Sequence, residues 1–312
     1  MPLDTLYLVR HAHRLNWSID IETGIYRANY PSPTGIPVDP TLTGPGVAQS
    51  LELAEHVSGT AFSPKPCRIY SSPFYRCLQT IQPTVEALKD LQETEKRDDV
   101  ELTVRTENGL GEWFGSSPFF THPSPATLEV LRPLFPTLLS PESPLSSTYT
   151  AHVYPSPNGE TITELHDRVA AALHAIITEV DAEIRKYEQA HPESAHESRG
   201  ILICSHAAPL IAMGRALTGN MPEDTSVEDF KVFTSSLSTY VRRRNPINST
   251  PGMQPSWRDG QGVAGGWDCV LNGDCSFLSE GEEKGWHFSG EEDFSSMPID
   301  SSGNNTTSLT KL

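Results

Sequence analysis

A short apolar run near the N-terminus, Leu6 to Val9, ends abruptly in Arg10-His11. Such a run is typical of a buried β-strand, and open α/β proteins bind ligands at the edge where their strands end. At that edge a guanidinium can hold an oxyanion such as a phosphoryl group, and a neutral histidine nitrogen can attack it. The meaning of the pair therefore depends on which partners the rest of the chain brings to the same edge.

Composition places the chain among globular proteins with some polar, poorly packed segments. It has 312 residues, 37% of them hydrophobic, and a mean hydropathy of −0.37. Its apolar runs stay well short of the ~18 residues needed to cross a bilayer, and Met1 to Thr5 does not resemble a signal peptide. The five cysteines are scattered, so we expect free thiols, no zinc site and an intracellular location, cytoplasmic and/or nuclear.

The chain is strongly acidic, with a net charge of −17. Residues 245–312 hold ten acidic and three basic residues, a net charge of −7. This balance disfavours direct binding to nucleic acid or to an anionic membrane. It leaves an anionic substrate open, because a local cluster of arginines can outweigh the overall charge.

The first part of the chain alternates predicted loops, helices and strands. We expect a loop over 16–41, a helix from about 47 to 57 capped by Thr43, a strand and then a turn over Pro66–Pro73, a helix over 75–91 that Pro83 kinks or breaks, and a strand at Leu102–Val104.

The second part begins with a Pro- and Ser-rich stretch, 115–157, that we interpret as a lid or insertion. A long amphipathic helix follows over 161–190. The apolar run Ile201–Cys204 then predicts a second buried strand, ending at His206, with a helix over 209–217 behind it. Val232–Thr234 and Ser238–Val241 are predicted to form a closing strand pair.

From about residue 245 the composition shifts toward Gly, Ser, Asp and Glu, yet aromatic residues recur roughly every ten residues. Disordered segments usually lack aromatics, so we expect 245–294 to be an acidic tail whose aromatics dock onto the domain. A segment that binds a protein partner is the alternative. Residues 295–312 are predicted to be disordered.

Several side chains that can act as nucleophile, anion ligand or acid are expected at one edge of the sheet. His11 and His206 each follow a strand, and parallel strands end at the same edge. Arg10, Arg14 and Arg76 would add permanent positive charge there, and Glu112 would add a proton donor. Each residue alone is commonly structural; their joint placement suggests a nucleophile, an anion clamp and an acid.

Five blocks of the chain resemble the histidine phosphatase (phosphoglycerate mutase-like) superfamily, branch 1. They are Leu8-Val-Arg-His-Ala12, Leu42-Thr-Gly-Pro-Gly46, Ser72-Pro-Phe-Tyr-Arg-Cys-Leu-Gln-Thr80, Gly109-Leu-Gly-Glu-Trp113 and Ser205-His-Ala207, in the family's order. The resemblance covers about residues 3–244 and implies one histidine phosphatase domain over 1–244. It implies a three-layer α/β/α fold with a mostly parallel central sheet. Ala12 stands where the family usually has Gly.

The resemblance also implies roles by position. His11 would become phosphohistidine, while Glu112 would act as general acid and then as base for water. The implied catalytic set is His11, Glu112, Arg10, Arg76 and His206, and the implied substrate-binding set is Arg10, Arg14, Arg76, His206 and Ala207. A backbone carbonyl near Gly44–Gly46 would set the tautomer of His11. No metal or cofactor is implied.

A closer resemblance lies within this family, to fungal proteins related to the phosphatase-like tau subunit of TFIIIC. It is carried by Asn16-Trp17, the loop up to Pro37 and the stretch Trp267 to Leu278. That subunit carries an additional C-terminal domain that binds another TFIIIC subunit, and we expect this chain to lack it.

Three functions follow as hypotheses. The first is a phosphatase acting through phosphohistidine, with a protein tyrosine phosphatase as its narrower form and a small molecule or phosphopeptide as substrate. The second is a scaffold associated with TFIIIC and RNA polymerase III transcription, with a protein partner bound through 245–294. A phosphoglycerate mutase is disfavoured, because Ala12-His13-Arg14 replaces the Gly-Glu-Ser of mutases.

Overall fold

The computed structural model describes residues 3–20, 23–95, 97–117, 119–140, 149–244 and 256–289. The predicted disorder of 295–312 lies outside these residues. The described part folds around a six-stranded sheet in the order β5-β4-β6-β1-β7-β8. Its strands are β1 Thr5–Arg10, β4 Pro66–Ser71, β5 Arg105–Thr106, β6 Gly200–Ser205, β7 Leu237–Arg242 and β8 Trp267–Asp274.

The four strands from β5 to β1 are mutually parallel, and β7 and β8 complete the sheet in antiparallel pairings. In the register of β1 with β6, Arg10 lies opposite Ser205. In the register of β4 with β6, Ser71 lies opposite Cys204. The strands β4, β6 and β1 therefore end at the same level, which brings the residues that follow them together.

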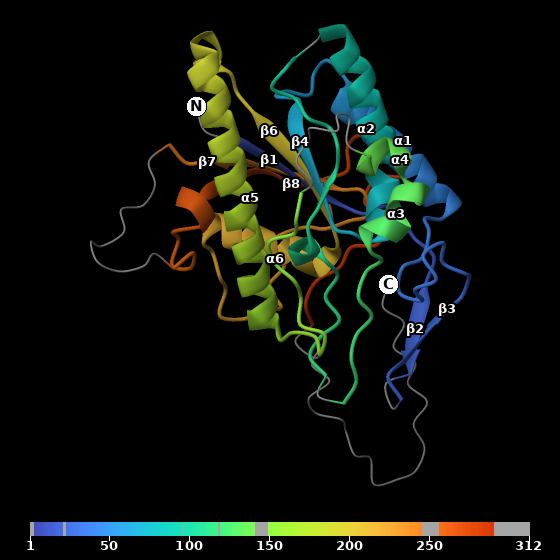
Figure 1. Cartoon of the computed structure of the whole chain (residues 1–312). Coiled ribbons are helices and arrows are strands. Elements are labelled where there is room, and N and C mark those ends of the chain that lie inside the picture. The colour runs from blue at the N-terminus through green and yellow to red at the C-terminus, as the bar shows by residue number, and fades with distance from the viewer. Residues whose placement is uncertain are drawn as a thin grey trace.

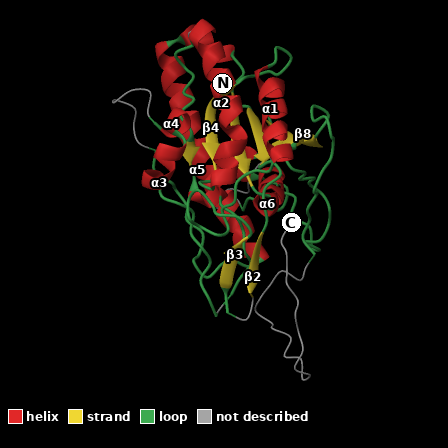
Figure 2. Cartoon of the chain, turned by 90° about the vertical axis from the view of Figure 1, so that its right-hand side faces the viewer, coloured by secondary structure: helices red, strands yellow, loops and turns green. Residues whose placement is uncertain are grey.

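Helices cover both faces of the sheet, so the predicted three-layer α/β/α architecture with a mostly parallel sheet is confirmed (Figure 1). On one face lie α1 Gly44–Ser58, α2 Tyr75–Glu95, α3 Leu128–Leu134 and α4 Pro136–Leu139; on the other lie α5 Ile162–Ala190 and α6 Ala207–Thr218. Figure 2 shows the first group in front of the sheet. Short 3-10 turns occur at Asn108–Leu110, Pro192–His196 and Val263–Gly265.

Alternation along β1 divides the core between the two faces. Leu6 and Leu8 pack with the residues of α5 and α6, whereas Tyr7 and Val9 pack with those of α1 and α2. All four side chains are buried. A strand buried on both sides is typical of a central parallel strand, and it holds Arg10 and His11 rigidly at its end.

The helix α1 begins as its sequence signals predict. The Oγ1 of Thr43 accepts a hydrogen bond from the Gly46 backbone N–H at 3.2 Å, which caps the first turn. The cap is therefore the predicted one, although the helix starts at Gly44, three residues before the predicted start at residue 47.

Pro83 does not end α2, which continues through it to Glu95. Proline removes one backbone hydrogen bond and crowds the preceding turn, at a cost of about 3 kcal/mol in a helix interior. Leu78, Ile81 and Val85 are completely buried on both sides of the proline. Their packing offsets the local cost, so the predicted break is wrong.

Two local predictions for strands also need correction. The segment expected to be an irregular loop contains a hairpin, β2 Trp17–Asp20 paired with β3 Ile25–Ala28. Trp17 and Ile19 are buried while Ser18 and Asp20 are more exposed, the alternation of a half-buried strand. The strand expected at Leu102–Val104 forms at Arg105–Thr106 instead.

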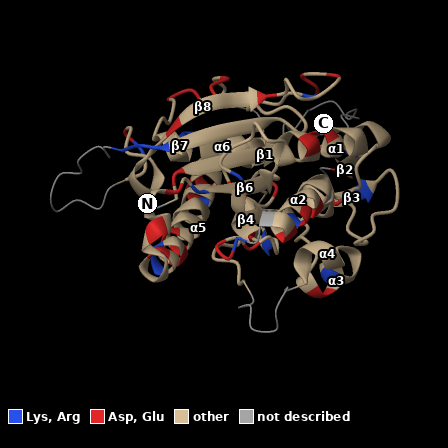
Figure 3. Ribbon diagram, turned by 90° about the horizontal axis from the view of Figure 1, so that it is seen from above, with Lys and Arg blue, Asp and Glu red and all other residues tan. Residues whose placement is uncertain are grey.

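The predicted strand pair near residue 240 is half correct. The strand β7 forms, but Val232–Thr234 is irregular, and the antiparallel partner of β7 is β8. Trp267 of β8 and Phe288 beyond it are buried in the core between the sheet, α5 and α6. Residues 256–289 therefore contribute a strand to the sheet as well as aromatic side chains to the core. Figure 3 shows acidic residues on the outer helices and in the loops beside β8.

The close approach of α1 to the loop after β1 generates a stability prediction. A Cβ added at Gly46 would lie 1.9 Å from the His13 carbonyl oxygen, whereas one added at Gly44 would meet nothing within 4 Å. We expect Gly46→Ala to lower the free energy of unfolding by about 1–3 kcal/mol because backbone must shift, and Gly44→Ala to change it by less than about 0.5 kcal/mol. Urea unfolding of the two variants checks this, and equal stabilities would contradict it.

Candidate active site

His11 lies directly after β1 and is buried at the edge where the parallel strands end. Its Nδ1 lies 2.9 Å from the Ala12 carbonyl oxygen. A carbonyl oxygen can only accept, so Nδ1 carries the proton and Nε2 keeps its lone pair. The carbonyl that sets this tautomer belongs to Ala12, not to the predicted Gly44–Gly46 turn.

The surroundings of His11 favour its neutral form. Burial lowers the pKa of the imidazole well below 6.5, and the positive charges of Arg76, Arg10 and Arg14 lower it further. The imidazole is consequently uncharged at neutral pH, which leaves Nε2 free to act as a nucleophile.

His206 follows β6 and lies beside His11, with ring centroids 5.3 Å apart. Its Nδ1 lies 3.0 Å from Arg76 Nη2 and its Nε2 lies 2.8 Å from Ser72 Oγ. Because the guanidinium can only donate, Nδ1 accepts and Nε2 donates its proton to the serine oxygen. Burial and then Arg76 lower the pKa of His206 well below its usual value.

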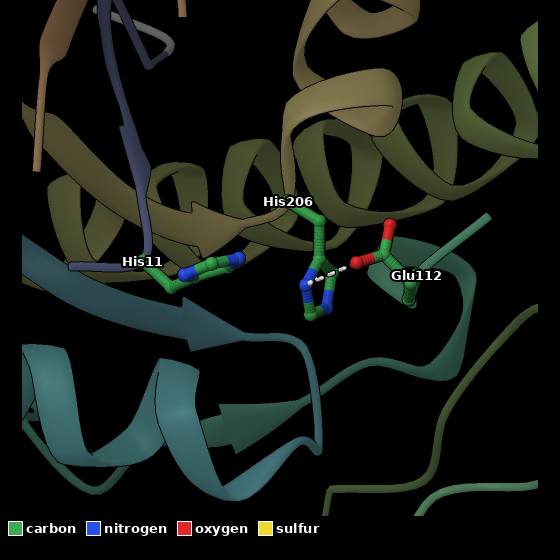
Figure 4. A group of neighbouring side chains, drawn as sticks. All are labelled: His11, Glu112 and His206. Atoms are coloured by element: carbon green, nitrogen blue, oxygen red, sulfur yellow. Dashed lines mark ion pairs between the residues drawn. The ribbon is translucent and has the colours of Figure 1, made fainter. Parts of the chain in front are cut away.

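Glu112 completes this group of three side chains (Figure 4). Its Oε2 accepts a hydrogen bond from Arg76 Nη2 at 3.0 Å and lies 3.4 Å from His206 Nδ1. Its Oε1 accepts from the Trp113 backbone N–H at 3.0 Å. The carboxylate is partly exposed, so it can exchange protons with a bound molecule.

Arg76 contacts this group and its side chain is completely buried. Nη1 donates to the Val38 carbonyl at 2.8 Å and lies 3.6 Å from Asp39 Oδ1. Burial raises the pKa of Asp39 to about 6, although Arg76 opposes the rise. Because Arg76 stands at the start of α2, this helix positions its guanidinium in contact with Glu112 and His206.

Arg10 and Arg14 lie on the wall of the same site and are also buried. Burial lowers the pKa of Arg10 to about 10 and that of Arg14 to about 9. Arg10 Nη1 donates to the carbonyls of Val232 and Lys284. Its Nε is buried and has no hydrogen-bond partner among the described residues, which suits an incoming oxyanion.

A small pocket of about 30 Å³ lies at this edge of the sheet. Its lining is formed by Arg10, His11, Arg14, Trp17, Glu112, Trp113, Ala207, Ala208 and Trp286. Ala207 stands at the start of α6, whose first backbone N–H groups favour anions. A larger cavity of about 330 Å³, lined by Cys67, Arg68 and Arg199 among others, contains none of the predicted site residues.

The structure brings all seven predicted site residues to this edge: five line the pocket, and Arg76 and His206 contact Glu112 of that lining. Sequence reasoning missed Ser72 as the partner of His206, although Ser72 opens one of the motif blocks. It also missed Trp286 and Lys284, because their contacts with residues near position 10 leave no local signal.

His11, Glu112 and His206 also present ligand atoms that all lie within 4.8 Å of one another. That spacing by itself suits a metal ion. Arg76, however, donates to both Glu112 and His206, and two further buried guanidinium groups line or adjoin the same space. An ion would have to enter against three positive charges, so the donor set fits an anion better.

Residues 6–116 match the family model of the histidine phosphatase superfamily (branch 1). These residues belong to this superfamily. The chain is 31% identical over 296 residues to the transcription factor tau 55 kDa subunit of Saccharomyces cerevisiae. The match covers 92% of this chain but spans only 59% of that subunit.

Solved structures of two phosphatases also match. The ecdysone phosphate phosphatase of Bombix mori, in complex with tungstate, is 18% identical with a TM-score of 0.49, over 80% of this chain and 97% of its own. A phosphoserine phosphatase mutant from Entamoeba histolytica is 17% identical with a TM-score of 0.42, over 88% of this chain and 98% of its own. In the described part of the chain, no helix is both long and apolar enough to span a bilayer.

Ala12, the departure from the superfamily's usual glycine, fits its position without strain. Its side chain is completely buried and its φ is not positive. Its backbone N–H donates to Thr80 Oγ1 at 2.9 Å, and its carbonyl accepts from His11. Both contacts use backbone atoms, so the added methyl group leaves the support of His11 intact.

The two neutral histidines predict that anion binding takes up protons. A dianion in the pocket favours the charged imidazoles and raises the lowered pKa values of His11 and His206. Sulfate does not itself titrate near neutrality, so it should bind more tightly as the pH falls from 7 to 5, approaching tenfold per pH unit for each proton taken up. Calorimetry in buffers of different ionisation enthalpy measures the uptake.

His206→Gln should reduce this uptake, while replacing the exposed His174 on α5 by Gln should not. A sulfate affinity that is independent of pH over this range would contradict the charge states assigned above.

Proposed function

We propose that this protein is a phosphomonoesterase that works through a phosphohistidine intermediate on His11. The observation that carries the proposal is the state of this side chain. Its Nδ1 proton is held by the Ala12 carbonyl, and its bare Nε2 belongs to a pocket with buried guanidinium groups around it. A nucleophile beside a permanent anion clamp is what transfer of a phosphoryl group requires.

In the first step, His11 Nε2 forms a bond to phosphorus while the bond from phosphorus to the ester oxygen breaks. The leaving oxygen takes its proton from the Glu112 carboxyl group, which acquires that proton from solvent or from a monoanionic substrate when the substrate binds. Arg10, Arg14 and Arg76 neutralise the charge on the phosphoryl oxygens, and His206 donates to the same group once protonated. Nothing in this step calls on a metal ion, because positive charge is already in place.

In the second step, water attacks the phosphorus of the phosphohistidine. The Glu112 carboxylate takes the proton of that water, the bond from Nε2 to phosphorus breaks, and inorganic phosphate leaves. His11 returns to its neutral form with Nδ1 still bonded to Ala12. The same carboxyl group therefore serves as acid and then as base.

The contact of Glu112 with Arg76 connects binding to proton transfer. In the free protein, Arg76 Nη2 donates to Glu112 Oε2 at 3.0 Å. A phosphoryl group competes for the same guanidinium, and its binding would loosen this ion pair. The carboxyl group would then be free to face the leaving oxygen.

Replacing His11 tests the mechanism directly. We expect His11→Ala to lower the turnover of p-nitrophenyl phosphate by at least about a thousandfold, because no other side chain can accept the phosphoryl group at that point. His174→Ala on the exposed side of α5 serves as the control and should keep full activity. Normal turnover by His11→Ala would reject the mechanism.

A second function, as a protein scaffold, is favoured by one specific observation. The yeast relative, 31% identical over most of this chain, is named as a subunit of a transcription factor. This favours association with a nuclear protein complex, with residues 245–294 as the proposed partner-binding segment; of these, 256–289 are described. Such a role would not need a working nucleophile.

The scaffold role has its own test. Deleting residues 245–312 would remove β8 from the sheet, so a point variant is the better probe. If assembly is the function, His11→Ala should capture the same transcription-factor subunits from nuclear extract as the unaltered protein, identified by mass spectrometry. Failure of the unaltered protein to capture such subunits would count against this role.

A further inference from the structure

Residues 279–289, here called the C-terminal strap, cross the sheet edge above the end of β1. At one end the Ser279 backbone N–H donates to Glu52 Oε1 on α1 at 3.2 Å. At the other end Phe288 is buried in the core beside α5 and α6. The strap therefore runs from the helical layer on one face of the sheet to the layer on the other, passing over the pocket.

The middle of the strap is tied to the Arg10-His11 motif. The Lys284 carbonyl accepts a hydrogen bond from Arg10 Nη1. Glu283 Oε2 accepts from Gln49 Nε2 at 2.8 Å, and Gln49 Oε1 in turn accepts from the His13 backbone N–H at 2.9 Å. These contacts fix the strap in register with the residues on both sides of His11.

The contact with Arg10 also orients its guanidinium. Nη1 is occupied by two backbone carbonyls, one of them from the strap. The opposite edge of the group carries Nε and Nη2, and Nε has no hydrogen-bond partner among the described residues. The strap thus holds Arg10 so that its Nε edge remains available to a phosphoryl group.

Trp286 in the strap forms part of the pocket wall together with His11 and Glu112. Its ring packs edge-to-face on Phe288 at 5.0 Å, and Phe288 packs edge-to-face on Trp113 at 5.5 Å. Trp17, from β2, lines the pocket as well, and its ring lies 5.8 Å from the Arg14 guanidinium carbon. Aromatic walls thus stand beside the cationic groups that would hold a phosphoryl group.

From this arrangement we infer that the C-terminal strap is a working part of the site and that Trp286 selects phosphomonoesters with a flat aromatic leaving group, such as phenyl phosphate or phosphotyrosine. The inference rests on the proposed phosphatase function. The phosphoryl group would take the arginines, and the attached ring would pack against the indoles. Aromatic pairs of this kind stabilise a complex beyond simple area burial, and an aliphatic leaving group would gain less.

Trp286→Ala tests the selection. We expect KM for phenyl phosphate to rise about three- to tenfold, with little change in KM for glycerol 2-phosphate and little change in kcat for either. Trp286→Phe, which keeps a flat ring, should restore most of the affinity. Trp257→Ala is the matched control, because Trp257 lies in the same C-terminal segment, stacks on His166 and is absent from the pocket lining.

A binding measurement separates this inference from the proposed function. In the His11→Ala background, calorimetry compares the affinities for phenyl phosphate and glycerol 2-phosphate with and without Trp286→Ala. Loss of affinity confined to phenyl phosphate supports the inference even if the unaltered protein shows no turnover. Equal losses for both molecules, or no preference for phenyl phosphate before the substitution, would overturn it and leave the phosphatase mechanism untouched.

Discussion

The arrangement of the site depends on the hydrogen bonds that the buried guanidinium of Arg76 makes. A charge taken out of water is costly unless it meets acceptors, and here the acceptors are the Val38 carbonyl, Glu112 and His206. Val38 lies in a loop, Glu112 follows the 3-10 turn Asn108–Leu110, and His206 follows β6. Satisfying one buried charge therefore requires three distant segments to take up the geometry that the site needs. Folding stability and site geometry are coupled through this one side chain.

Much of the sheet and the site could be predicted because the signals are local. Apolar runs that end at Arg10-His11 and at His206 mark parallel strands, and parallel strands must end at one edge. Thr43 marks the start of α1 by its capping chemistry. The wrong predictions concern elements whose stability comes from elsewhere. Pro83 remains helical because the core packs on both sides of it, and β8 forms because the free edge of β7 pairs with it.

The electrostatics of the molecule differ sharply between surface and site. The chain carries a net charge of −17, yet buried arginines surround His11. Charges on the surface are screened over about 8 Å at physiological ionic strength, whereas buried groups at close range are screened much less. The neighbouring guanidinium groups consequently decide the charge state of His11 and His206. An acidic protein can in this way keep a cluster of buried guanidinium groups beside two uncharged histidines.

The hydrogen bond between Arg10 and the Lys284 carbonyl joins residues 274 positions apart. Contacts between residues so far apart in sequence form late in folding. The entropy cost of closing a long loop must be met before such a contact contributes any stability. During synthesis from the N-terminus, β1 and His11 leave the ribosome long before the strap exists. The residues Arg10 and His11 are therefore made first and reach their final contacts last. A partly synthesised chain would hold His11 in an open, unfinished pocket until residue 284 has been added.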